Sequence, residues 1–181
     1  MSFGKEENHK TGVRICGVGG MGVILSSVVL GKAAIYDNRI AVQTQSYGAE
    51  QRGTKVRSDV IISESGVINY PIIDKADILI AFTQEAFDFF IPNIKPDAQI
   101  FINSNNVKYK GKTNNLYEIP ARNLAKELKN ERVLNLIMLG ALIKITNIVS
   151  MESMIKSITD TVSRSFIEIN IQALQKGHDY F

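Results

Sequence analysis

Glycines dominate the part of this sequence that is best suited to binding chemistry. The segment GVGGMG, Gly17–Gly22, follows an apolar run and precedes a pattern with helical spacing. Such a turn lets the backbone approach a ligand closely and directs the N–H groups of the helix at an anion. Gly17, Gly19 and Gly22 also fit the dinucleotide fingerprint G-x-G-x-x-G, with Gly20 inside it. The segment predicts either a ligand-binding turn or a tight strand-to-helix turn that packs against a neighbouring chain.

The acidic residue that completes the dinucleotide fingerprint is missing. It should end the second strand, about 20 residues further on, where it would bind a ribose hydroxyl. Here that strand ends in VQTQ, residues 42–45, and the nearby acids Asp37 and Glu50 lie at unsuitable positions. An independent module that binds NAD or FAD is therefore an alternative and not the preferred interpretation.

A second candidate is the polar segment AVQTQSYGAEQRGTKVRSD, Ala41–Asp59. In an open α/β sheet, a loop here leaves the carboxyl end of a strand beside the glycine turn, where ligands usually bind. An arginine in this loop can bind a carboxylate or phosphate through two parallel hydrogen bonds, and a tyrosine can stack or donate a hydrogen bond. A solvated loop with surface charges is the alternative. The candidate residues are Tyr47, Gly48, Glu50, Gln51, Arg52 and Gly53.

Side chains that could act as a nucleophile or a base are few. Cys16 is the only cysteine, which excludes a disulfide, a thiolate zinc cluster and a self-contained iron–sulfur site. Because it lies in an apolar strand pattern, we interpret it as a small core residue. The two histidines, His9 and His178, lie near opposite ends of the chain, and no G-x-S-x-G or metal-ligand spacing occurs. We predict no catalytic residue, no metal site and no cofactor bound by this chain alone.

Alternating strand and helix patterns position these candidates. The pattern ESG followed by VIN predicts a hairpin after the third strand, which would make the sheet mixed. Helices separate the other strands and should cover both faces. The sequence predicts a three-layer α/β/α sandwich with a mixed, mostly parallel sheet, as one domain over residues 11–181 after a loose tail over residues 1–10. The expected strands span residues 13–18, 40–42, 58–63, 76–82, 98–104 and 116–119.

Helical spacing marks the remaining segments. A helix that starts at residue 84 should break at Pro92, and residues 150–177 form a long amphipathic run with cap residues Ser150 and Gly177. Residues 132–145 are apolar on every helical face, so this helix is buried inside the domain or is partly covered by a partner subunit. In that helix Asn135 needs hydrogen bonds if buried, and Gly140 permits close approach of another helix.

Composition narrows the function classes. Apolar residues make up 45% of the 181-residue chain and charged residues 22%, as is normal for a globular protein. A net charge of +3, with Lys and Arg spread along the chain, argues against nucleic-acid binding. No apolar run approaches the length of about 18 residues that a membrane span needs, and no signal region precedes the domain. These features predict a cytoplasmic protein that binds neither membranes nor nucleic acid.

Several motifs, in this order, resemble the gamma subunit of 2-oxoacid:ferredoxin (acceptor) oxidoreductases. The similarity covers about residues 14–177, and its most specific element is the group Tyr47-Gly48 with residues 50–53. The motifs are GVGGMGV, SYGAEQRGTKVRSDVIIS, ADILIAF, YEIPA and NLIMLGAL. Two positions depart from the family pattern, because Met21 replaces a common glutamine and Thr54 replaces a second glycine. Thr54 therefore requires an ordinary backbone conformation.

The resemblance implies a role inside a larger enzyme. Such enzymes use thiamine diphosphate, Mg and iron–sulfur clusters to decarboxylate a 2-oxoacid oxidatively and pass the acyl group to coenzyme A. It implies alpha and beta partner subunits, a delta subunit as a further candidate, and ferredoxin or another electron acceptor. The gamma chain would be a Rossmann-like domain with the glycine turn and the loop Tyr47–Gly53 at the coenzyme A side or a subunit interface. We expect 2-oxoglutarate as substrate, then pyruvate or branched-chain oxoacids; a pure assembly scaffold is a further alternative.

Overall fold

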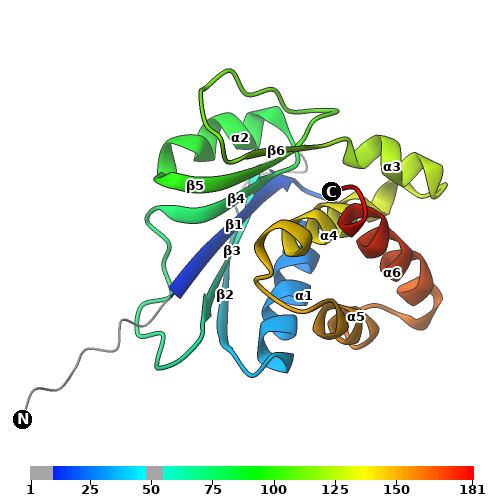
Figure 1. Cartoon of the computed structure of the whole chain (residues 1–181), viewed down its shortest axis with the longest axis horizontal. Coiled ribbons are helices and arrows are strands. Elements are labelled where there is room, and N and C mark those ends of the chain that lie inside the picture. The colour runs from blue at the N-terminus through cyan, green and yellow to red at the C-terminus, as the bar shows by residue number, and fades with distance from the viewer. Residues whose placement is uncertain (1–9, 48–54) are drawn as a thin grey trace, which may run out of the picture.

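The computed structural model describes residues 10–47 and 55–181. Its centre is a six-stranded sheet with the strand order β2-β3-β1-β4-β5-β6 (Figure 1). β1 is parallel to β4, β4 to β5 and β5 to β6, whereas β3 is antiparallel to both of its neighbours. The prediction of a mixed, mostly parallel sheet is confirmed. The strands are β1 (Lys10–Val18), β2 (Ile40–Tyr47), β3 (Lys55–Ser63), β4 (Ala76–Ala81), β5 (Ile94–Asn103) and β6 (Leu116–Ile119).

The antiparallel hairpin lies at a different place from the one predicted. β2 and β3 form it, whereas residues 64–75 after β3 contain no strand. Pro71 gives a physical reason, because proline has no N–H for a strand ladder and restricts the residue before it. Ile73 of this connection packs instead against Ile61 of β3.

Much of the segment 41–59, expected to be a polar loop, is strand. β2 reaches Tyr47, and β3 begins at Lys55. Gln43 shows why polar residues are accepted there: its Nε2 donates to Ser58 Oγ at 2.8 Å and to Ser27 Oγ at 3.2 Å. These partners come from distant parts of the chain. Tertiary hydrogen bonds therefore satisfy the polar side chain of Gln43, and its polar character did not indicate a loop.

Helices cover both faces of the sheet, as predicted. α1, α4, α5 and α6 lie on one side, and α2 lies on the other (Figure 1). Successive β1 residues enter different clusters: Ile15 belongs to the large core, whereas Cys16 packs in the smaller cluster with Phe87 and Phe90 of α2. The helices are α1 (Val23–Tyr36), α2 (Gln84–Phe90), α3 (Ala121–Glu127), α4 (Leu134–Thr146), α5 (Met151–Thr159) and α6 (Arg164–His178), with 3₁₀ turns at Ile91–Asn93 and Glu131–Val133.

The helical prediction needs two corrections near the carboxyl terminus. The run over residues 150–177 is two helices, α5 and α6. Ser150 caps α5 as predicted, because its hydroxyl accepts from Ser153 N at 3.1 Å. Gly177 is not the C-cap of α6, which continues to His178. It lies where α6 crosses α4, and a Cβ there would be 1.9 Å from the carbonyl oxygen of Ile137.

The apolar helix α4 is buried within this chain. Residues 134–143 are all buried, and α4 packs on α6, α3 and α1. Gly140 does permit close helix approach, since a Cβ there would lie 2.0 Å from the carbonyl oxygen of Leu174 in α6. Asn135 finds its hydrogen bonds near the start of α1, where its Nδ2 donates to Ser26 Oγ at 3.3 Å and Gly22 O at 3.4 Å. The buried helix thereby packs directly beneath the glycine turn.

Candidate functional site at the carboxyl edge of the sheet

The connections of the sheet diverge at the carboxyl ends of β1 and β4. The chain leaves β1 through α1 towards β2, and it leaves β4 through α2 towards β5 on the other face. In open α/β sheets, ligands bind in the crevice at this switch point. The glycine turn follows β1, and Thr83 follows β4, so both lie at this edge.

The glycines of the turn have different surroundings. Gly17 is buried, and a Cβ there would lie 3.2 Å from both Phe82 Cβ and Val23 Cγ2. Gly22 has φ 74°, and a Cβ there would lie 2.9 Å from Cγ of Asn135. Gly19 and Gly20 are exposed, and a Cβ at either would have no neighbour within 4 Å. Only the middle of the turn is therefore open to a ligand or a partner.

The first turn of α1 adds an electrostatic preference to this open backbone. No side chain caps its N-terminus, and no acidic residue lies in its first turn. The N–H groups at a helix start are without intrahelical partners and carry a partial positive charge. The exposed turn next to Val23 therefore favours a negatively charged group.

The strand ends that flank residues 48–54 lie beside the glycine turn. Val18, the last residue of β1, pairs with Lys55, and Tyr47 pairs with Val56. Both ends of the segment 48–54 are therefore placed at the carboxyl edge. The predicted site residues Gly48, Glu50, Gln51, Arg52 and Gly53 lie outside the described residues, as do Thr54 and the side chain of Tyr47. Their role stays a prediction.

Two basic residues of β3 stand next to that segment. Lys55 Nζ lies 3.8 Å from Glu85 Oε1 and 4.5 Å from the ring centroid of Phe89. Arg57 Nε lies 3.6 Å from Asp59 Oδ2. Both side chains are more than a third exposed, so they present positive charge at this edge of the sheet. These two residues were not predicted from the sequence, although their spacing of two in KVRSD indicates one face of a strand.

A buried ion pair fixes β1 against β3 below these residues. Arg14 Nε donates to Asp59 Oδ1 at 2.9 Å, and its Nη2 donates to Asp59 Oδ2 at 2.8 Å and to Ile73 O at 2.6 Å. Both side chains are almost completely buried. A bidentate pair of this kind specifies geometry strongly, so it fixes the register of β1 against β3. This pair was not predicted from the sequence, although a charge inside an apolar strand is its signal.

Buried polar atoms without a partner gather at the same edge. Among the described residues, four buried side-chain atoms have no hydrogen-bond partner: Thr83 Oγ1, Asn103 Oδ1 and Nδ2, and Arg14 Nη1, the last of which lies in the middle of β1 and away from this edge. Thr83 precedes α2, and Asn103 ends β5. Buried polar groups in folded proteins are nearly always paired, so Thr83 and Asn103 offer unused hydrogen-bonding capacity at the carboxyl ends of β4 and β5.

A cavity lies on the helical side of the glycine turn. Its volume is about 410 Å³. It joins the exposed turn to the start of α6, and it combines amide side chains and one arginine with apolar walls. Its lining residues are Gly20, Gly22, Leu25, Asn130, Arg132, Val133, Asn135, Thr161, Val162, Phe166 and Asn170.

Cys16 and His178, the described reactive groups among those considered from the sequence, lie apart, one in the core and one on the surface. Cys16 is fully buried, as predicted for a core residue, and this burial raises the pKa of its thiol to about 12. His178 Nδ1 lies 3.2 Å from Asp179 Oδ1 on the surface, and His9 is outside the described residues. Residues 10–47 and 55–181 contain no group of three His, Cys, Asp or Glu side chains placed to hold a metal. In the same ranges, no helix is long and apolar enough to cross a membrane.

Known proteins share this fold and this sequence pattern. The family model described as pyruvate ferredoxin/flavodoxin oxidoreductase matches residues 12–180. The chain belongs to this family. A 2-oxoglutarate synthase subunit KorC from Methanocaldococcus jannaschii is 42% identical over 92% of this chain and 91% of its own length. A KorC subunit from Methanothermobacter thermautotrophicus is 38% identical over 92% of this chain and 93% of its own length.

Solved structures of the family agree with the fold. A keto/oxoacid ferredoxin oxidoreductase gamma subunit from Geobacter sulfurreducens is 34% identical, with a TM-score of 0.81 over 93% of this chain and 96% of that chain. A 2-oxoglutarate:ferredoxin oxidoreductase from Magnetococcus marinus, solved with 2-oxoglutarate, coenzyme A and succinyl-CoA, has a TM-score of 0.83 at 24% identity and supports the fold alone. This structural match covers 96% of our chain but only 31% of the longer Magnetococcus marinus chain. The resemblance to oxidoreductase gamma subunits is confirmed, and an independent nucleotide-binding module is not favoured.

Proposed function

We propose that this chain is the gamma subunit of a multi-subunit 2-oxoglutarate:ferredoxin oxidoreductase and that it contributes a binding surface and no catalytic group. The KorC relatives, which this chain matches over nearly its full length, support the 2-oxoglutarate substrate. Pyruvate and branched-chain oxoacids are next, because PorC and VorA subunits match at lower identity. The working complex is expected in the cytoplasm with alpha and beta subunits, with a delta subunit as a further candidate, and with ferredoxin or another electron acceptor.

The proposal includes a division of labour between the subunits. An iron–sulfur cluster does not fit this chain, because its one cysteine is buried with a raised pKa. Thiamine diphosphate, Mg and the clusters are therefore assigned to the other subunits, where oxidative decarboxylation of the oxoacid would take place.

The binding of coenzyme A is the step to which this chain contributes directly in the proposal. The single observation that carries this assignment is the open backbone at Gly19 and Gly20. It adjoins an uncapped helix start, and it lies at the same edge as Lys55, Arg57 and both ends of the segment 48–54. Exposed N–H groups and cations suit the phosphates of coenzyme A. We assign the glycine turn and the residues Tyr47–Gly53 to the coenzyme A side of the shared site or to the subunit contact that closes it.

Reconstitution tests the proposal. The remaining subunits are assayed with and without this chain for acceptor reduction with 2-oxoglutarate, pyruvate and 2-oxoisovalerate. We expect full activity only with the chain present and the highest kcat/KM with 2-oxoglutarate. Equal activity without the chain would leave it an assembly scaffold, and preference for another oxoacid would reassign the substrate.

Arg52→Ala tests the contact more finely. We expect it to weaken assembly or to raise the KM for coenzyme A about tenfold, because it removes a charge-assisted bidentate donor. The matched control is Arg164→Ala, an exposed arginine at the start of α6 that does not line the cavity beside the glycine turn. If Arg52→Ala behaves like this control in both measurements, the loop does not face the shared site.

A further inference from the structure

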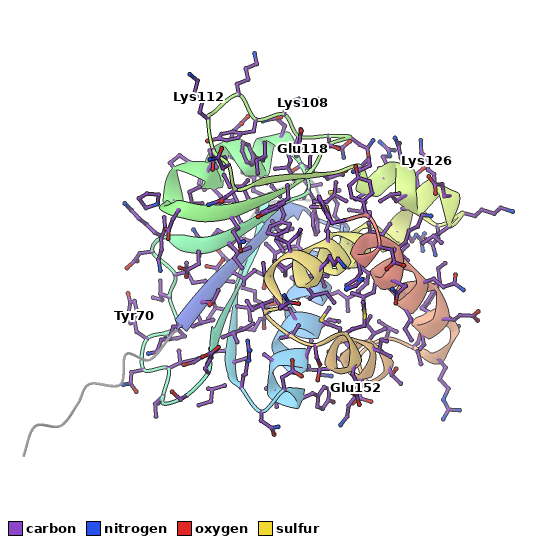
Figure 2. All side chains as sticks on the ribbon, viewed as in Figure 1. Tyr70, Lys108, Lys112, Glu118, Lys126 and Glu152 are labelled. Carbon is purple, nitrogen blue, oxygen red and sulfur yellow. The ribbon has the colours of Figure 1, made fainter. Side chains whose placement is uncertain are left out.

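The two edges of the sheet are protected very differently. At one edge, β6 is 4 residues long, carries the exposed Glu118 and is followed by Pro120 (Figure 2). Its Tyr117 stacks on Phe101, with ring centroids 4.7 Å apart, and meets Phe181 of the C-terminus edge to face. Short length, a charge and an adjoining proline are the features by which proteins prevent edge strands from pairing with other chains.

The opposite edge, β2, has none of these features. It is 8 residues long, and its sequence IAVQTQSY contains no charged residue and no proline. Its neighbour β3 is 9 residues long and pairs with it from Ile40 to Tyr47 without a bulge. Ile35 and Ile40, which flank its start, are 56% and 41% exposed. A long, regular, uncharged edge strand is a template for another strand.

The backbone groups on the outer side of β2, away from β3, determine what can bind there. In an antiparallel ladder, alternate residues direct their N–H and C=O groups away from the partner strand. Within residues 10–47 and 55–181, the backbone of β2 pairs only with β3, apart from Thr44 O, which accepts from Ser58 Oγ. A row of outward donors and acceptors at strand spacing is matched by an extended peptide backbone.

The side chains of β2 set the character of that peptide. Val42 lies opposite Ile61, which packs on the face away from α1, whereas Ala41 lies opposite Ile62 of the large core. On the α1 side, Gln43 already donates hydrogen bonds to Ser27 and Ser58. The face of β2 that carries Val42, away from α1, therefore offers β-branched side chains for cross-strand pairs. With no charge on β2, a neutral strand is the complementary partner.

We propose that β2 accepts a neutral extended strand from another subunit of the oxidoreductase, which continues the six-stranded sheet. This inference rests on the proposed function, because it requires a multi-subunit complex. Another subunit is favoured over a second copy of this chain because β2 leads directly into the segment 48–54 at the edge assigned to the shared site. A strand beside β2 would therefore continue the same subunit contact.

Hydrogen exchange on the intact complex tests the pairing. Peptides covering β2 are compared between the isolated chain and the reconstituted enzyme. We expect the outward amides of β2 to exchange at least about tenfold more slowly in the complex, because each gains a ladder hydrogen bond. The amides of β6 are the internal control and should change little. Unchanged exchange in β2 within an assembled, active complex overturns the proposal and leaves the proposed function standing.

A charged edge provides the second test. Thr44→Lys with Gln45→Lys places one cation on each face of β2, at positions that do not pair with a basic residue of β3, and these charges oppose strand addition. We expect its affinity for the other subunits to fall at least about tenfold, while its far-ultraviolet circular dichroism and melting temperature match those of the parent chain. Thr159→Lys with Ser165→Lys adds the same charge at exposed positions of the α5–α6 region and should assemble normally. Normal assembly of the β2 variant contradicts the proposal.

Two further outcomes are distinguishable. If the isolated chain forms a dimer that the β2 lysines dissociate, and β2 is protected only in that dimer, the partner is a second copy and the proposal is wrong. If the chain never joins the other subunits, the proposed function fails first, and the isolated chain keeps rapid exchange in β2.

Discussion

Two glycine pairs lie at opposite extremes of packing in this chain. At the glycine turn, a Cβ on Gly19 or Gly20 would have no neighbour within 4 Å. At the crossing of α4 and α6, a Cβ on Gly140 or Gly177 would lie 2.0 Å or 1.9 Å from a backbone oxygen of the other helix. The crossing glycines are required by the fold itself. Within residues 10–47 and 55–181, no atom beyond the adjoining residues lies within 4 Å of a Cβ on either turn glycine, so this backbone is open to a ligand or a partner.

Gly177→Ala should have the largest effect on stability. The added methyl group meets Ile137 O at 1.9 Å, and backbone cannot move aside as a flexible side chain can. The two helices must separate, and we expect the free energy of unfolding to fall by about 3 kcal/mol. Urea denaturation measures this change.

Gly31→Ala is the matched control for that prediction. Gly31 is also a buried helical glycine, but a Cβ there meets only Val60 Cγ1 at 3.8 Å, an ordinary contact. Because alanine favours a helix over glycine, we expect equal or greater stability, by up to about 1 kcal/mol. Similar losses in both variants would mean that the crossing is not specially tight.

Gly22→Ala should have an intermediate effect, because Gly22 belongs to the turn but packs like a crossing glycine. Its φ of 74° is unfavourable for alanine, and the new Cβ would lie 2.6 Å from Asn135 Nδ2. We expect a loss of about 2 kcal/mol, part from the left-handed backbone and part from displacing the amide.

Asn135→Ala separates these two contributions. In a double-mutant cycle, the pair Gly22→Ala and Asn135→Ala should show a favourable coupling of about 1 kcal/mol, because the truncated side chain no longer obstructs the methyl group. The residual loss at Gly22 then measures backbone conformation alone. Strict additivity would mean that the amide moves aside without cost.

Gly20→Ala should have a smaller effect than Gly22→Ala. The residue has φ 90° but an empty surrounding, so only the backbone opposes alanine. We expect a loss of about 1 kcal/mol in chemical denaturation. A loss as large as that of Gly22→Ala would show that the turn is packed more tightly than its exposure indicates.

Sequence patterns predicted what depends on neighbours along the chain. The strand before the glycine turn, the helix that breaks before Pro92 and the cap at Ser150 are all governed by residues a few positions apart, and all are present. The covered faces followed from the alternation of these elements, whereas the mixed sheet was predicted from a hairpin after β3 and arises instead from the antiparallel pairing of β3 with β2 and β1. The carboxyl edge could be located for the same reason, since the connection of β1 through a glycine turn to a helix fixes where ligands approach.

Features set by distant residues could not be read from local patterns. Gly177 looked like a helix terminator, whereas its role is decided by Ile137 on another helix. Gln43 made β2 look like a loop because its partners, Ser27 and Ser58, belong to α1 and β3. The pair of Arg14 and Asp59 escaped notice because an ion pair inside a sheet is visible only once the strands are in register.

Gly19→Ala should leave stability nearly unchanged and still impair the enzyme. Gly19 does not have a positive φ, and its Cβ would enter open space, so we expect a stability change within about 0.5 kcal/mol of zero or a slight gain. If coenzyme A or a partner backbone approaches the turn closely, the methyl group occupies that space. The reconstituted complex should then show an increase of about tenfold in the KM for coenzyme A or in the dissociation constant for the other subunits. Gly31→Ala serves again as the control, since its methyl group is buried inside the chain. Wild-type KM and assembly for Gly19→Ala would remove the distinction between the two glycine pairs, because the open turn would then be empty space without a function.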